Sequence, residues 1–182
     1  MDSVNQDYAI NSNEANNCTV YGNIAYDVAF GFQGTENAFS AVVYNNTFVA
    51  RNRAINQSGG TATTHYFKNN ILDGGDYDMK IGSVSTVEGG YNIFKNDAAV
   101  DSGGSTYNGS ANDFYTTDPQ YTNAGGNDYT IIPGGFACVG ALPITGYNTR
   151  LDPTSSWPDD VRTIGSTEEF GAYGCYKGAR LQ

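Results

Sequence analysis

The sequence predicts an all-β fold: a right-handed parallel β-helix of about four short coils, with a C-terminal cap rich in proline and aromatic residues. Two observations support this fold. Short apolar runs meet an asparagine in VYGNIAY, VVYNNTF, FKNNILD and GGYNIFK, and these asparagines recur every 22 to 24 residues. A second series, DYAI, DVAF, NRAI and DYDM, recurs every 20 to 25 residues in phase with the first. Two series with one period indicate a repeat whose units stack.

The recurring asparagines need an explanation, because asparagine is a poor strand former and is costly to bury. In stacked coils, equivalent residues lie about 4.8 Å apart. Each side-chain amide can then donate a hydrogen bond to one coil and accept one from the other. We therefore expect a hydrogen-bonded ladder of Asn23, Asn46, Asn70 and Asn92. The alternative is an unrelated β-sandwich in which asparagine only marks turns.

Each coil is expected to hold three short strands and two inward positions. Two residues after each ladder asparagine stand Ala25, Phe48, Leu72 and Phe94. The third strand would contribute a second inward stack of Ile10, Phe30, Ile55 and Met79. The neighbouring outward row would be flat and mostly neutral, with Ala9, Ala29 and Ala54, then Asn11, Gly31 and Asn56. We assign residues 1–112 to the coils and residues 113–182 to a capping segment of the same domain.

Charge and hydropathy narrow the function. The 182 residues include 9 Lys and Arg against 19 Asp and Glu, which gives a net charge of −10. This charge argues against a nucleic-acid partner, which would need clustered cations. No segment approaches the roughly 20 apolar residues that span a bilayer, so we expect no membrane insertion. The polar, lysine-poor composition favours an extracellular or cell-surface protein.

The two ends of the chain raise separate expectations. The start carries no signal-peptide pattern, and DYAI at 7–10 resembles the third strand of a coil that lacks its first two. We therefore expect the N-terminal end to be covered by self-association or by the remainder of a longer chain. Among the three cysteines, Cys138 and Cys175 are a plausible disulfide pair, and Cys18 is expected to be an inert buried thiol. The single histidine, His65, is expected to be structural.

The tail resembles the C-terminal end of secreted bacterial parallel β-helix proteins of the pectate-lyase-like superfamily. The residues that carry the resemblance are Asp118, Pro119, Tyr121, Asp128, Tyr129, Ile131, Pro133 and Gly134, then Phe170, Gly171, Ala172 and Tyr173. GGFACVG and Glu169 depart from the usual pattern. The resemblance specifies the fold better than the activity, and it implies that Tyr129, Phe136 and Trp157 cover the last coil.

Enzymes of this fold bind polysaccharides along the third-strand face and use a Lys or Arg base, in some cases with Ca²⁺. Here the resemblance implies candidate catalytic residues Asp76, Asp78, Lys80 and Arg53, and candidate binding residues Asp27, Asn56 and Arg51. Strand alternation in DYDMK would place Asp76, Asp78 and Lys80 on one outward face. Asp73 and Asp76 are candidate ligands for Ca²⁺. The competing interpretation is a solvated charge cluster with surface ion pairs.

Two function classes follow. One is a non-catalytic extracellular β-helix module that serves as a rigid structural or glycan-recognising element and stacks through its open N-terminal coil. The other is the C-terminal part of a carbohydrate-active enzyme, a polysaccharide lyase or glycoside hydrolase. Sparse cations make a poor catalytic groove, so the sequence favours the module.

Overall fold

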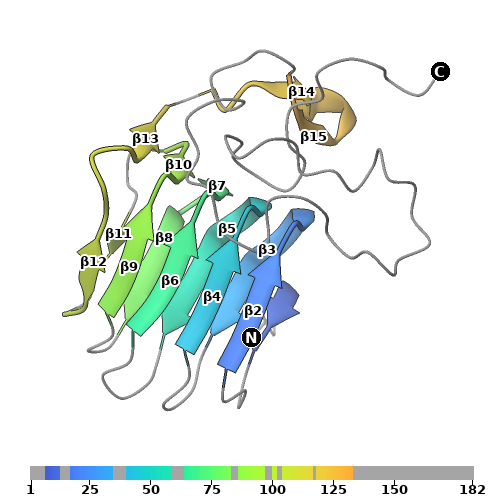
Figure 1. Ribbon diagram of the computed structural model, residues 1–182. Helices are drawn as coiled ribbons and strands as arrows, with labels where there is room; N and C mark the ends of the chain where they lie inside the picture. The colour runs from blue at the N-terminus through green and yellow to red at the C-terminus, as the bar shows by residue number, and fades with distance from the viewer. Residues whose placement is uncertain are drawn as a thin grey trace, which may run out of the picture.

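The structure, a computed structural model, describes residues 7–12, 17–34, 40–58, 64–82, 86–96, 100–101, 104–116 and 118–132. These residues form a parallel β-solenoid of about four turns, which confirms the predicted fold class. Figure 1 shows the strands stacked side by side, with the first coil at one end and β12 and β13 at the other.

One face of the solenoid is a five-stranded parallel sheet. Its strands precede the ladder turn of each coil and pair in the order β12, β9, β6, β4, β2. Their bounds are β2 (Asn17–Tyr21), β4 (Ser40–Tyr44), β6 (Thr64–Lys68), β9 (Thr86–Gly90) and β12 (Thr106–Asn108). Alternate residues point to the core, so Val20, Val43 and Phe67 form one buried column.

The strands that follow the ladder turn belong to an eight-stranded sheet, which bends to form the other two sides of each coil. Its strands are β1 (Tyr8–Asn11), β3 (Ile24–Gly34), β5 (Thr47–Ser58), β7 (Ile71–Gly74), β8 (Tyr77–Gly82), β10 (Ile93–Phe94), β11 (Val100–Asp101) and β13 (Phe114–Tyr115). The long strand β5 pairs with β7 through its first half and with β8 through its second half. One strand can therefore serve two sides of a coil.

Within the tail, residues 118–132 include a small antiparallel hairpin of β14 (Tyr121–Asn123) and β15 (Asp128–Ile131), joined by the 3-10 helix η1 (Ala124–Gly126). The Tyr129 ring centroid lies 5.3 Å from that of Tyr26 in β3. Tyr129 thus packs against the side of an early coil, and the expectation that it covers the last coil is wrong. Phe136, Trp157, Cys138 and Cys175 lie outside the described residues.

The asparagine ladder is present and polarised. Nδ2 of Asn23 donates to Oδ1 of Asn46 at 2.9 Å. The same bond joins Asn46 to Asn70 and Asn70 to Asn92, at 3.0 Å in each case. The backbone N–H of each rung donates to the same oxygen of the next rung. Asn23, Asn46 and Asn70 therefore donate to the next rung toward the C-terminal end, and Asn46, Asn70 and Asn92 accept from the rung before them.

The residue before each rung explains why asparagines occur in pairs. Asn45 and Asn69 adopt left-handed backbone conformations with φ of 52° and 58°, and the equivalent Gly22 and Tyr91 have φ of 67° and 57°. Asparagine tolerates this region better than most residues do. In NN, the first asparagine makes the turn and the second forms the rung.

The sequence analysis missed a fifth rung, Asp113. Its Oδ1 accepts from the backbone N–H of Asn92 at 2.9 Å. Its Oδ2 accepts from the Tyr107 hydroxyl at 2.9 Å and from the Ser110 N–H at 3.1 Å. Asp113 follows Asn92 by 21 residues, so the spacing carried the signal, but the change of residue type concealed it.

The core confirms one inward stack and corrects the other. Ala25, Phe48, Leu72 and Phe94 pair in register as predicted. The second stack is Ile10, Phe32, Ile55 and Met79, so the assignment of Phe30 is wrong. The β3–β5 pairing shifts register between Tyr26 and Phe30, and such an irregularity changes which residues face inward.

The predicted outward row is also partly wrong. Ala54 is fully buried in the core cluster. A Cβ atom added at Gly31 would lie 2.6 Å from Cβ of Phe48 and 2.5 Å from the carbonyl oxygen of Ala54. Gly31 therefore faces the core, where close backbone approach requires glycine. Ala29 and Asn56 are buried as well, so this row is not a flat exposed surface.

Candidate functional site

The bend between β7 and β8 holds the acidic residues that the sequence analysis singled out. Asp78 is fully buried. Its Oδ1 accepts from the Gly74 N–H at 2.7 Å and its Oδ2 from the Asn96 N–H at 2.8 Å, and the Asn96 side chain adds a third bond at 3.0 Å. Burial raises the pKa of Asp78, and these N–H donors offset part of that rise. The contacts join two successive coils at the bend.

Asp73 lies at the same bend and is also buried. Its Oδ2 accepts from Nζ of Lys95 at 2.7 Å, which links β7 to the coil above. The Tyr121 hydroxyl is buried and has no hydrogen-bond partner among the residues that the structure describes. Burial raises the pKa of Tyr121 well above its usual value, and the charges of Asp73 and Asp78 add to that rise.

Asp76, Asp78 and Lys80, the three charged residues of DYDMK, do not share an exposed face. Asp76 is exposed, whereas Asp78 points into the bend. Nζ of Lys80 lies 5.9 Å from the centre of the Tyr77 ring. The expectation from simple strand alternation is wrong, because the chain bends where β8 begins. Among the described residues, no group of three or more His, Cys, Asp or Glu side chains is arranged to hold a metal ion. The Ca²⁺ site at Asp73 and Asp76 remains a prediction.

Two of the candidate binding residues meet on the surface. NH1 of Arg51 is 2.6 Å from Oδ1 of Asp27, and NH2 is 3.0 Å from Oδ2 of Asp7. Asp7 was not anticipated. The three side chains come from successive coils, and all are largely exposed. Exposed ion pairs of this kind contribute about 0–1 kcal/mol each to the free energy of unfolding. They therefore join neighbouring coils weakly at the surface.

Arg53 and Asn56 form a separate, mostly buried polar pair on the third strand. NH1 of Arg53 donates to Oδ1 of Asn56 at 3.0 Å, and Nδ2 of Asn56 donates to Oε1 of Gln33 at 2.5 Å. The Arg53 guanidinium also lies 5.7 Å from the centre of the Phe30 ring. Asn56 is only 5% exposed, so its amide serves mainly to join neighbouring coils.

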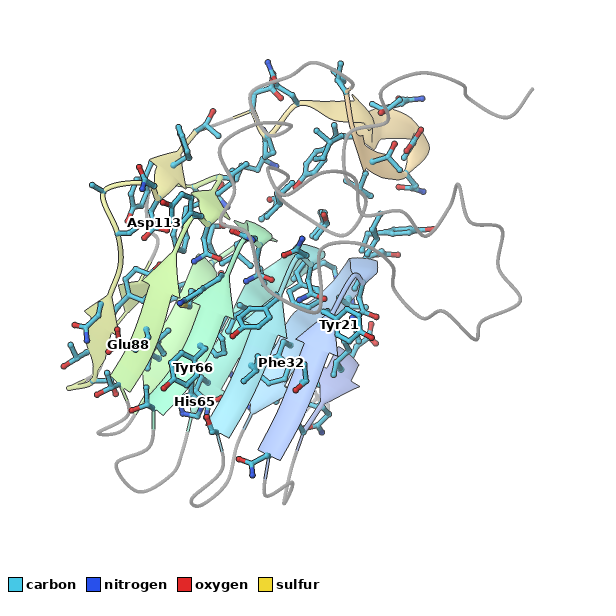
Figure 2. All side chains as sticks on the ribbon, viewed as in Figure 1. Tyr21, Phe32, His65, Tyr66, Glu88 and Asp113 are labelled. Carbon is cyan, nitrogen blue, oxygen red and sulfur yellow. The ribbon has the colours of Figure 1, made fainter. Side chains whose placement is uncertain are left out.

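The outer face of the five-stranded sheet gathers polar and aromatic side chains that the sequence analysis did not select. We call it the outer tyrosine face. Register places Tyr44 between Tyr21 and Lys68, and Tyr66 between Val42 and Glu88. Figure 2 shows Tyr21, Tyr66 and Glu88 on the strands of this sheet. The alternation of inward and outward residues in SAVVY and THYFK could have predicted this face from the sequence.

The outer tyrosine face carries little net charge. Tyr66 is 38% exposed, and Nζ of Lys68 lies 6.0 Å from the centre of its ring. Glu88 accepts from Nδ2 of Asn108 at 2.7 Å. One edge of the face is a column of small polar side chains in register: Asn17, Ser40, Thr64, Thr86 and Thr106. Flat aromatic and hydroxyl surfaces of this type suit polar, uncharged ligands.

His65 has a structural environment, as expected. It is fully buried in β6, and Nδ1 accepts from the Ala41 N–H at 3.2 Å. Burial lowers the pKa of His65 to about 4. The ring is therefore neutral at pH 7 and joins neighbouring coils inside the core. Cys18, in contrast, is only partly buried, and its Sγ lies 3.4 Å from Oγ of Ser12.

Comparisons with known proteins give no match: no family model, no curated protein and no solved structure is similar to this chain. The resemblance to the pectate-lyase-like superfamily thus rests on the repeat region and the tail residues of this sequence, with no matching family or relative. In the part of the chain that the structure describes, no helix has the length and apolar character needed to cross a membrane.

Proposed function

We propose that this chain is a non-catalytic extracellular β-solenoid module that serves as a rigid structural or glycan-recognising element. The observation that carries this proposal is that three charged side chains expected to act in catalysis or metal binding instead form hydrogen bonds and ion pairs within the solenoid. Asp78 accepts a hydrogen bond from the Gly74 N–H at the bend, Asp73 forms an ion pair with Lys95, and Arg53 donates a hydrogen bond to Asn56. Side chains held in this way support stacking of coils rather than a reacting substrate.

The outer tyrosine face is the surface best suited to a glycan. Its exposed ring at Tyr66 offers a stacking platform, and the hydroxyl column beside it offers donors and acceptors. Within this face, Lys68 and Glu88 balance each other, while the whole chain carries a net charge of −10. This balance favours a neutral polysaccharide over an acidic one, which the overall charge would repel.

A binding panel of neutral and acidic polysaccharides tests the proposal. We expect retention on at least one neutral polysaccharide, and Tyr66→Thr should weaken it at least tenfold. The matched control is Tyr115→Thr, because Tyr115 is 51% exposed but lies on β13, outside this face. Equal loss in both variants, or binding of acidic polymers alone, would contradict the assignment of this face.

A carbohydrate-active enzyme, a polysaccharide lyase or glycoside hydrolase, is the second candidate. The observation in its favour is the buried Tyr121 hydroxyl, which has no hydrogen-bond partner among the described residues and whose pKa is raised by burial and, to a smaller extent, by the charges of Asp73 and Asp78. Release of reducing ends or of unsaturated products from polysaccharides would support the enzyme, provided that Tyr121→Phe abolishes the release. No product from any tested polymer would favour the module.

A further inference from the structure

One asparagine differs from those of the ladder in its exposure and in the residue that follows it. Asn108 precedes Gly109, and this is the one Asn-Gly pair in the sequence. It lies at the end of β12, and both residues are exposed. The ladder residues Asn46, Asn70 and Asn92, in contrast, are fully buried. Asn108 therefore meets solvent with a glycine as its next residue.

An Asn-Gly pair can react with itself. The backbone nitrogen of the glycine attacks the side-chain amide carbon Cγ of the asparagine, the C–Nδ2 bond breaks, and ammonia leaves with the backbone proton. The product is a five-membered succinimide ring, which water opens at either carbonyl to give aspartate or isoaspartate. Glycine favours the attack because it has no Cβ to obstruct the ring and because its backbone adopts many conformations.

The hydrogen bonds around Asn108 leave this reaction open in the folded chain. No described residue accepts a hydrogen bond from the Gly109 N–H, whereas the N–H groups of Gly22 and Asn69, each just after a strand of the same sheet, donate to carbonyls of the next coil. Nδ2 of Asn108 donates to Oε1 of Glu88 at 2.7 Å, at the exposed surface. The attacking nitrogen is thus not engaged within the described part of the chain, and the leaving group is held by a surface bond.

Packing explains why glycine stands at position 109. A Cβ atom there would lie 2.5 Å from Cε1 of Tyr107 and 2.6 Å from Oδ2 of Asp113. The Tyr107 hydroxyl donates to the same Oδ2 at 2.9 Å, in the contact that supports the fifth rung. A larger residue at 109 would displace these groups. The reactive pair is therefore a consequence of how this coil packs.

We propose that Asn108 is a site of spontaneous deamidation, and that the reaction turns one end of the outer tyrosine face acidic. Register places Glu88 between Tyr66 and Asn108. The new carboxylate would stand beside that of Glu88 and, when ionised, has no hydrogen to donate to it. Two like charges at this position repel each other, so the change weakens the pairing of β12 with β9. This site does not depend on glycan binding.

Peptide mapping by mass spectrometry tests the assignment. The full chain would be incubated in warm, mildly alkaline buffer, both folded and unfolded in urea. Deamidation replaces an NH₂ group by OH, which the mass of the peptide reveals, and an isoaspartyl methyltransferase labels the isoaspartate product. Asn112 is the internal control, because it is exposed in the same stretch of chain but precedes an aspartate.

We expect Asn108 to convert at least tenfold faster than Asn112 in the folded chain, and at a rate within tenfold of its rate in urea. Asn108→Gln should remove the conversion, because glutamine would have to form a less favourable six-membered ring. Earlier conversion of Asn112, or conversion of Asn108 in urea but not in the folded chain, would overturn the proposal.

The variant Asn108→Asp tests the structural consequence. It should reproduce the anion-exchange mobility of the modified protein, and it should speed amide hydrogen exchange in β12. A mobility different from that of the modified protein would overturn the assignment to Asn108, and unchanged exchange in β12 would overturn the weakened pairing.

Discussion

Replacing Asn70 by aspartate distinguishes a ladder from a set of turns. Asn70 is fully buried and sits in the middle of the column. Its Oδ1 accepts from the backbone N–H and from Nδ2 of Asn46, and its Nδ2 donates to Oδ1 of Asn92 at 3.0 Å and to the Val43 carbonyl at 2.9 Å. Aspartate can still accept from Asn46, but when ionised it donates nothing to Asn92 or Val43.

The magnitude follows from these contacts. Asn70→Asp leaves the Val43 carbonyl without the side-chain donor, brings a carboxylate oxygen against Oδ1 of Asn92 and buries a charge with no cation beside it. An unsatisfied buried polar group costs about 1–3 kcal/mol, and an uncompensated buried charge costs roughly 3–5 kcal/mol. We therefore expect a loss of about 4 kcal/mol in the free energy of unfolding at pH 7. The deficit should shrink at low pH, because a protonated aspartate can donate again.

Urea denaturation followed by circular dichroism measures this loss, with Asn70→Leu as the uncharged comparison. The control is Asn108→Ala, since the Asn108 side chain is exposed and its amide donates to Glu88 at the surface. That change should cost under about 0.5 kcal/mol. If asparagine served only to favour a turn, aspartate would replace it at little cost. A loss below about 1 kcal/mol for Asn70→Asp would refute the ladder argument.

Three further predictions use urea or thermal unfolding of single variants. Tyr91→Asn should raise the free energy of unfolding by about 1 kcal/mol, because Tyr91 has φ of 57° and a left-handed conformation costs such a residue roughly 1–2 kcal/mol; a lower stability would show that packing of the ring matters more. Gly31→Ala should lower stability by about 1–3 kcal/mol, since its new Cβ would overlap Phe48, and an unchanged melting temperature would contradict the inward assignment. His65 should make the protein less stable as the pH falls from 6.5 toward 4, by roughly 3 kcal/mol in total, because the unfolded chain takes up a proton that the folded ring resists. His65→Val should remove this part of the pH dependence in denaturant titrations at several pH values, and an identical slope in the variant would rule out His65 as its source.

Parts of the candidate site could be anticipated from the sequence and parts could not. Strand alternation placed Tyr66 and Glu88 on one face with Lys68 nearby, although the sequence analysis did not use that information. The environment of Asp78 depends on Asn96, which is 18 residues away and belongs to the next coil. A local pattern such as DYDMK gives no sign that the chain bends there and turns one carboxylate inward.

The sequence by itself determined the stacking. The ladder asparagines and the first inward stack follow the period directly, because each rung contacts the same position of the next coil and the chemistry repeats with the sequence. Only the tertiary structure decided that Phe32 rather than Phe30 lies in the second stack. It also showed that Asp113 completes the ladder. Both outcomes have a physical reason. A register shift changes which residues face inward without changing the composition of the strand. The final rung needs only to accept hydrogen bonds, so aspartate can replace asparagine there and the repeat of asparagines ends without a visible motif.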